Sequence, residues 1–244
     1  MRHLPNLLTL ANLFFGCCAL LYTLHGQPVT AAFFTLGSFI CDYADGMLAR
    51  ALKVSSPLGK ELDSLADVVS FGVVPGAMLY MLLSQSAMNC HLEGAADFPL
   101  VPAALPAFIL SAFSGLRLGR FNLDTRQTSY FIGLSTPACT VLVLGLVLSA
   151  HHDRFGLAEY IRSPWLLYPL IGVLSWLLNA EIPMYGLKIK RLDLRSNLLM
   201  LGFAALLIVS ALWLKELSLT LIVLLYILAS LFSRERVVAS AGQA

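Results

Sequence analysis

The stretch Asp42-Tyr-Ala-Asp45-Gly46-Met-Leu-Ala49-Arg50, followed after eight residues by Gly59-Lys-Glu-Leu-Asp63-Ser-Leu-Ala-Asp67, places four aspartates in an otherwise strongly apolar chain. A carboxylate at the centre of a membrane-spanning helix costs roughly 2.5–3.5 kcal/mol on insertion scales. Four unpaired carboxylates facing lipid would together cost on the order of 10 kcal/mol. We expect divalent metal ions in a polar cavity to offset this cost, and we expect the function to reside here.

The composition indicates an integral membrane protein. Of the 244 residues, 58% are hydrophobic and only 12% are charged, whereas soluble domains carry about 25% charged residues. The mean hydropathy of +0.80 points the same way. A net charge of +2 is too small to indicate nucleic acid as a partner. We therefore expect membrane lipids to surround the chain.

The apolar segments predict an all-α, polytopic membrane helix bundle. About eight segments are long enough to span a bilayer, or nearly so, and we expect them to surround a cytoplasm-facing polar cavity. The chain should form a single integral membrane domain over residues 1–244, with a catalytic core at about 1–185 and two further membrane helices within about 197–232. The last two are short and could instead form a re-entrant pair. The predicted segments are 5–25, 29–52, 60–83, 100–119, 130–150, 164–182, 197–213 and 216–232.

The basic residues predict the orientation in the membrane. If the N-terminus is cytoplasmic, 13 of the 16 Lys and Arg fall in cytoplasmic segments, and only Arg154, Arg162 and Lys215 do not. Positively charged residues are enriched in cytoplasmic loops of membrane proteins. The sequence therefore predicts a multi-pass protein of the cell membrane with both termini in the cytoplasm. It also places the aspartates near the cytoplasmic surface.

The aspartate spacing predicts a divalent-metal site on a helical hairpin. Asp42 and Asp45 are three residues apart and Asp63 and Asp67 are four apart, so each pair shares one helix face. Oxygen-only ligands suit Mg²⁺ or Mn²⁺, and four carboxylates suffice for two ions that clamp a pyrophosphate. Intramembrane ion pairs without metal are an alternative, as is an ion-coupled transporter. The acidic residues outnumber the nearby Lys and Arg, so ion pairing alone would leave part of the negative charge unbalanced.

The same residues resemble a known signature. The pattern Asp-x₂-Asp-Gly-x₂-Ala-Arg-x₈-Gly-x₃-Asp-x₃-Asp is similar to that of the CDP-alcohol phosphotransferase family, and this chain matches every specified position. The resemblance implies a metal-dependent transfer of a phosphatidyl-type group from a CDP-linked donor to an alcohol, with release of CMP. It also implies a possible homodimer. The implied metal ligands are Asp42, Asp45, Asp63 and Asp67, and the implied CDP-binding residues are Asn6, Thr9, Gly46, Ala49, Arg50 and Gly59.

Further stretches within residues 1–140 resemble the phosphatidylserine synthase branch of that family. They include Pro5-Asn6-Leu-Leu-Thr9 and Ser114-Gly-Leu-Arg117-Leu-Gly-Arg120-Phe-Asn122, whereas Ser135 stands where the branch would have proline. The resemblance implies CDP-diacylglycerol and L-serine as substrates.

The residues suggest how such an acceptor would bind. Arg117 and Arg120 suit the serine carboxylate, and Asn122 or Asp124 suits its ammonium group. Asp67 is our candidate for the general base. Arginine would equally suit glycerol phosphate or inositol phosphate. These acceptors, and an archaeal lipid donor with serine, therefore stay open as alternatives.

Overall fold

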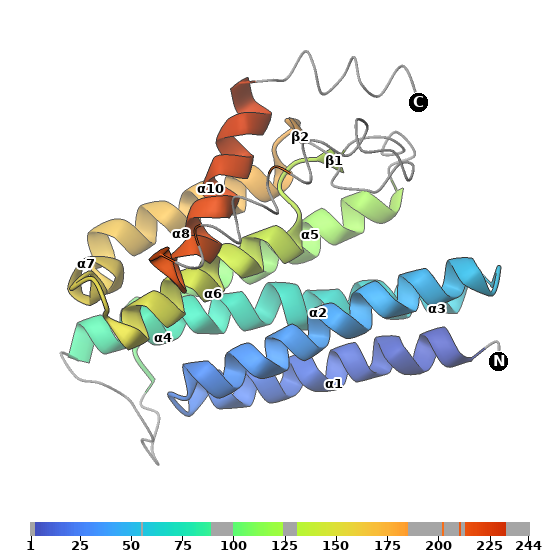
Figure 1. Ribbon diagram of the computed structural model, residues 1–244, viewed down its shortest axis with the longest axis horizontal. Coiled ribbons are helices and arrows are strands. Elements are labelled where there is room, and N and C mark those ends of the chain that lie inside the picture. Colours follow the sequence, from blue (N-terminus) through green and yellow to red (C-terminus); the bar gives the residue numbers. More distant parts are fainter. Residues whose placement is uncertain are drawn as a thin grey trace.

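The computed structural model describes residues 3–54, 56–88, 100–123, 131–184, 202, 210 and 213–232. Nearly all of these residues are helical (Figure 1). The elements are α1 (Leu4–Leu24), α2 (Pro28–Ala51), α3 (Pro57–Val68), η1 (Val69–Val73), α4 (Val74–Met88), η2 (Pro102–Phe108), α5 (Ile109–Leu123), β1 (Phe131–Ile132), α6 (Thr136–His152), α7 (Ala158–Arg162), α8 (Pro164–Asn179), β2 (Pro183–Met184) and α10 (Leu217–Phe232).

The described helices agree closely with the predicted apolar segments. Three of them are long and apolar enough to cross a membrane, namely Leu4–Leu24, Pro57–Met88 and Pro102–Leu123. Helices α6, α8 and α10 are apolar but shorter. The protein is thus a helical membrane protein, although the predicted number of eight spans is not established. The predicted span 197–213 and both chain ends lie largely outside the described residues.

Helix α2 is long enough to span but is less apolar than α1. It has 24 residues, and Asp42 and Asp45 lower its mean hydropathy. Four residues on one stripe of this helix are buried, namely Thr35, Ser38, Cys41 and Asp45, whereas the apolar Phe33, Leu36 and Ile40 are exposed. The polar stripe of α2 therefore faces the protein interior, and its apolar side faces outward, where lipid would lie.

The turn between α2 and α3 is built from local signals. Lys53 has a positive φ of 51°, and the amides of Lys53 and Val54 donate to the carbonyls of Arg50 and Ala49. This pairing is a Schellman motif, which satisfies the last carbonyls of a helix. Helix α3 then begins with Pro57 in its first turn, and the Ser56 side chain accepts a hydrogen bond from Gly59 N. Capping at both ends thus fixes where each helix of the pair begins or ends.

Helix α1 packs against both members of that pair. It lies alongside α2 over much of its length and also contacts α3, η1 and α4 (Figure 1). By contrast, α2 and α3 make few direct contacts with each other within the described residues. The sequence predicted a hairpin whose two acidic faces converge. The acidic faces do converge, but the two helices are not packed tightly on each other, since α1 packs against both and a cavity lies along their polar residues.

A π-helical turn interrupts the long helix two residues after Asp67. Residues Val69–Val73 form η1, which loosens the regular hydrogen-bond ladder of the helix. Side chains from other helices approach its carbonyls. Ser111 Oγ donates to Gly72 O at 2.9 Å, and Thr140 Oγ1, which shares its single proton with Thr136 O at 3.0 Å, lies 3.3 Å from Phe71 O. The irregular backbone thus finds polar partners within the protein, as a membrane environment requires.

The remaining helices close the bundle around the buried α4. Helix α5 packs on α8, and α10 packs on α6, where Thr220 Oγ1 donates to Leu142 O at 3.1 Å. Ser135 accepts from Ala138 N at the start of α6, so the residue that departs from the branch pattern serves as a helix cap. The two short strands form one antiparallel pair. The core is apolar and centred on α4, in which 12 of the 15 residues are buried.

Gly16 allows α1 to approach η1 closely, and its substitution should destabilise the fold. A Cβ at residue 16 would collide with the Ser70 side chain and lie 3.1 Å from Ser70 Cα. We expect Gly16→Ala to lower the free energy of unfolding by about 1–3 kcal/mol, because backbone must shift. Thermal unfolding in detergent would measure this. Gly172→Ala in α8 is the control, since a Cβ there meets no heavy atom within 4 Å, and equal melting temperatures for both variants would contradict the expectation.

Candidate active site

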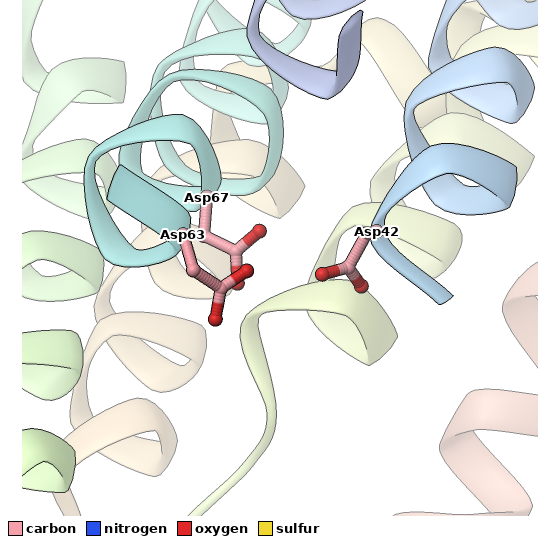
Figure 2. Close-up of side chains that lie close together, drawn as sticks. All are labelled: Asp42, Asp63 and Asp67. Atoms are coloured by element: carbon pink, nitrogen blue, oxygen red, sulfur yellow. The ribbon is translucent and has the colours of Figure 1, made fainter. Parts of the chain in front are cut away.

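Three of the four predicted aspartates converge. Asp42 from α2 and Asp63 and Asp67 from α3 each offer a carboxylate oxygen, and these oxygens lie within 4.8 Å of one another. Figure 2 shows the carboxylates of Asp63 and Asp67 pointing from one helix toward Asp42 on the other. The spacing of three and four residues placed each pair on one helix face. The tertiary fold then turned the two faces toward each other.

Asp45 has a different environment from the other three. Its side chain is 7% exposed, and Thr9 Oγ1 on α1 donates to Asp45 Oδ2 at 2.6 Å. Thr9 Oγ1 also lies 3.1 Å from Pro5 O, but its single proton goes preferentially to the charged acceptor at the shorter distance. Asp45 therefore lies beside the three-carboxylate cluster, with one oxygen committed to α1.

The cluster fits a hard divalent cation. Oxygens on opposite sides of an ion bound at 2.0–2.6 Å lie roughly 4–5 Å apart, which matches the spread of the three carboxylate oxygens. Asp63 Oδ1 is buried and has no hydrogen-bond partner within the described part of the chain. A buried charged oxygen without a partner is costly. A bound Mg²⁺ or Mn²⁺ would satisfy it.

A cavity opens beside the cluster and contains most of the predicted nucleotide-binding residues. Its volume is about 790 Å³, within the range of small-molecule sites. Asn6, Thr9, Gly46, Ala49 and Gly59 line it, together with Asp45 and Asp63. A Cβ on Gly46 would meet nothing within 4 Å, so the glycine leaves open space there. The wall is therefore formed by α1, the end of α2 and the start of α3.

Arg50 is the one predicted CDP-binding residue that does not line this cavity. It is exposed near the end of α2, one helical turn beyond Gly46. Two other cations, Lys53 and Lys60, line the cavity instead. From the sequence, we counted these lysines for topology and charge balance and gave them no role in binding. Their positions follow from the turn between α2 and α3, which brings both to the cavity wall.

The three predicted acceptor-binding residues have unlike environments. Arg117 is 7% exposed and its Nε is buried without a hydrogen-bond partner within the described residues, whereas Arg120 is exposed. The Arg117 guanidinium lies 5.9 Å from the Phe121 ring centroid and interacts electrostatically with Asp67. Asn122 Nδ2 donates to Ser64 Oγ at 2.7 Å. The structure thus buries Arg117, leaves Arg120 exposed, and connects α5 to α3 through Asn122. Asp124, the alternative partner for the ammonium group, lies outside the described residues.

Sequence reasoning missed two residues around these groups. Asn12 on α1 is fully buried and donates from Nδ2 to Asp67 Oδ1 at 3.2 Å. Tyr226 on α10 is buried and interacts electrostatically with Arg117. A polar residue one turn after Thr9 was a usable signal for Asn12. No local signal identified Tyr226, because α10 reaches Arg117 only through the fold.

Comparisons with known proteins identify the class. Residues 2–179 match the model of the CDP-alcohol phosphatidyltransferase family, and the chain belongs to this family. Three curated relatives all carry the name CDP-diacylglycerol–serine O-phosphatidyltransferase.

These relatives align over most of the chain. The Helicobacter pylori protein is 33% identical over 174 residues, which is 70% of this chain and 68% of the relative. The Mycobacterium leprae protein is 33% identical over 75% of this chain and 58% of its own length. The Bacillus subtilis protein is 31% identical over 56% of this chain and 71% of its own length.

The three-carboxylate cluster should bind Mn²⁺ through Asp63. Since loss of groups that merely support metal ligands costs 10–100-fold in affinity, we expect Asp63→Asn to weaken Mn²⁺ binding by more than about 100-fold. Electron paramagnetic resonance of free Mn²⁺ would measure this. The metal-free variant should melt no lower than the wild type, because the substitution removes repulsion among like charges.

Glu61→Gln is the matched control for Asp63→Asn. Glu61 is exposed, lies on the same helix and loses the same charge. Its Mn²⁺ affinity should equal that of the wild type. Retention of wild-type affinity by Asp63→Asn would exclude Asp63 as a ligand.

Proposed function

We propose that this chain transfers the phosphatidyl group of CDP-diacylglycerol to the hydroxyl of L-serine and releases CMP. The observation that carries the proposal is the convergence of Asp42, Asp63 and Asp67 beside a cavity lined by the matched motif residues. Membership of the CDP-alcohol phosphatidyltransferase family supports the reaction class. The names of the relatives support serine as the acceptor. The reaction is a step of phospholipid synthesis.

The cavity between α1, α2 and α3 is the proposed site for the CDP head of the donor. Asn6, Thr9, Gly46, Ala49 and Gly59 form its wall, and small residues there admit a nucleotide where larger side chains would block it. Lys53 and Lys60 offer positive charge to phosphate oxygens. Arg50 remains a proposed contact from the rim. The acyl chains of the donor would extend sideways into the bilayer.

Asp42, Asp63 and Asp67, with Asp45 beside them, would hold the divalent metal, proposed as two Mg²⁺ or Mn²⁺ ions. When bound, such ions neutralise charge on the donor pyrophosphate and on the departing CMP. The aspartates also keep their own charge away from lipid, since they face the interior. Thr9 fixes Asp45 at the boundary between the cluster and the cavity.

Asp67 is the proposed general base. The serine hydroxyl oxygen forms a bond to the donor phosphorus, the bond from that phosphorus to the CMP oxygen breaks, and Asp67 accepts the hydroxyl proton. A direct displacement of this kind needs no covalent enzyme intermediate. Asp67 suits the role because it belongs to the aspartate cluster and also interacts electrostatically with Arg117. An acceptor bound by Arg117 would then lie next to the base.

Arg117 is the proposed partner of the serine carboxylate. Its Nε lacks a hydrogen-bond partner within the described residues and is buried, so an anionic acceptor would satisfy it. From the sequence, Arg120 was proposed for the same carboxylate and Asn122 for the serine ammonium group. Arg120 is exposed, which makes Arg117 the stronger candidate for the carboxylate, and Asn122 donates to Ser64. We further propose a homodimer with both termini in the cytoplasm.

A panel of acceptors would test the proposed function directly. Purified protein with CDP-diacylglycerol and Mn²⁺ should release CMP with L-serine and not with glycerol phosphate or inositol phosphate. Asp67→Asn should lower the rate by about 10²–10⁴-fold, the usual contribution of a general base or acid. CMP release with another alcohol and none with serine would reject serine as the acceptor. Ion flux in vesicles without CMP release would favour a transporter.

Substitution of the two arginines should separate their roles. We expect Arg117→Lys to raise the KM for serine about 10- to 100-fold, because a hydrogen bond to a charged group contributes about 1.5–3 kcal/mol. The KM for the donor should not change. Arg120→Lys is the matched control and should stay within about twofold, since exposed ion pairs contribute little. Equal effects of the two variants on the serine KM would contradict the assignment.

A further inference from the structure

Asn12 connects α1 to both helices that carry the aspartates. Its backbone carbonyl accepts hydrogen bonds from Ser38 Oγ on α2 at 3.1 Å and from Ser70 Oγ on η1 at 3.2 Å. Its side chain reaches Asp67. Asn12 is fully buried, so three hydrogen bonds hold one residue at the junction of three helical segments.

The Asn12 side chain acts on one oxygen of Asp67. Nδ2 lies 3.2 Å from Asp67 Oδ1, and a reversed amide would place two acceptors against each other. The amide therefore donates to the carboxylate. Among the described residues, Asn12 supplies the one hydrogen bond recorded for the Asp67 side chain. This contact restricts the rotation of the carboxylate without occupying its second oxygen.

The environment of the amide oxygen of Asn12 indicates that this residue does more than fill space in the core. Asn12 Oδ1 is buried without a hydrogen-bond partner within the described residues. A buried amide oxygen without a partner costs about 1–3 kcal/mol, and an apolar side chain of similar volume would avoid that cost. Fold stability alone therefore does not favour asparagine at this position. The hydrogen bond that Asn12 Nδ2 donates to Asp67 does favour asparagine there.

We propose that Asn12 is a positioning residue that orients Asp67 for the metal cluster. Thr9, three residues earlier on the same face of α1, donates in the same way to Asp45. One face of α1 thus binds one aspartate from each of the two acidic helices. Hydrogen-bond donors of this kind orient metal-ligating carboxylates and raise metal affinity. The consequence for turnover rests on the proposed function, but the consequence for metal binding does not.

Mn²⁺ binding to Asn12→Leu in the purified full chain would test the proposal. The substitution keeps a similar volume and removes the donor. We expect the dissociation constant for Mn²⁺ to rise about 10- to 100-fold, as measured by electron paramagnetic resonance. At saturating Mn²⁺ the kcat should fall while the KM for serine stays within about twofold, because Asn12 does not touch the acceptor. If Asn12→Leu does not fold, Asn12→Ser serves, since its side chain is too short to reach Asp67.

Asn179→Leu is the matched control. Asn179 Nδ2 also donates one hydrogen bond, to Phe113 O at 2.9 Å, and its Oδ1 is likewise buried without a partner within the described residues. Its Mn²⁺ affinity should equal that of the wild type, even if its melting temperature falls. A folded Asn12 variant with wild-type Mn²⁺ affinity would overturn the positioning role.

Failure of the proposed function would look different. In that case the wild type would release no CMP with serine, while Asn12→Leu would still bind Mn²⁺ more weakly than the wild type. That result would support the positioning role of Asn12 and reject the proposed reaction.

Discussion

The fold must hold together carboxylates that repel one another and cannot face lipid, and the rest of the structure depends on this constraint. Asp42, Asp63 and Asp67 bring three oxygens within 4.8 Å in a helical membrane protein. Each isolated charge would be costly in the bilayer, and together they repel one another. A metal ion would resolve both problems, provided that the helices present the charges to one point. The rest of the bundle can be understood as the means of holding α2 and α3 in that relation.

Helix α1 is central to that arrangement. It packs on α2, α3, η1 and α4 and binds an aspartate of each acidic helix through Thr9 and Asn12. The absence of a side chain at Gly16 lets η1 approach, which brings Ser70 to the Asn12 carbonyl. Because α1 contacts both helices, they need not pack tightly against each other. The cavity with its glycine and alanine wall occupies the space between them.

A polar site inside a membrane needs hydrogen-bond partners for its backbone groups as well as partners for its charges. The π-helical turn η1 begins two residues after Asp67, and its Gly72 carbonyl accepts a hydrogen bond from Ser111 of α5. Farther along the chain, α10 lies beyond the residues that match the family model, yet it places Tyr226 near Arg117. The surroundings of the proposed acceptor site are thus assembled from segments that are distant in sequence.

The sequence by itself determined the helical membrane class, the approximate bounds of most helices and the family. Apolar length reveals spans, and the three- and four-residue spacings place Asp42 with Asp45 and Asp63 with Asp67 on shared faces. Only the tertiary structure decided which neighbour each face meets. It packed α1 against both acidic helices, so that Thr9 donates to Asp45 and Asn12 donates to Asp67. It also buried Arg117 and left Arg120 exposed. Periodicity defines a face of a helix, but contacts between distant segments define what lies opposite it.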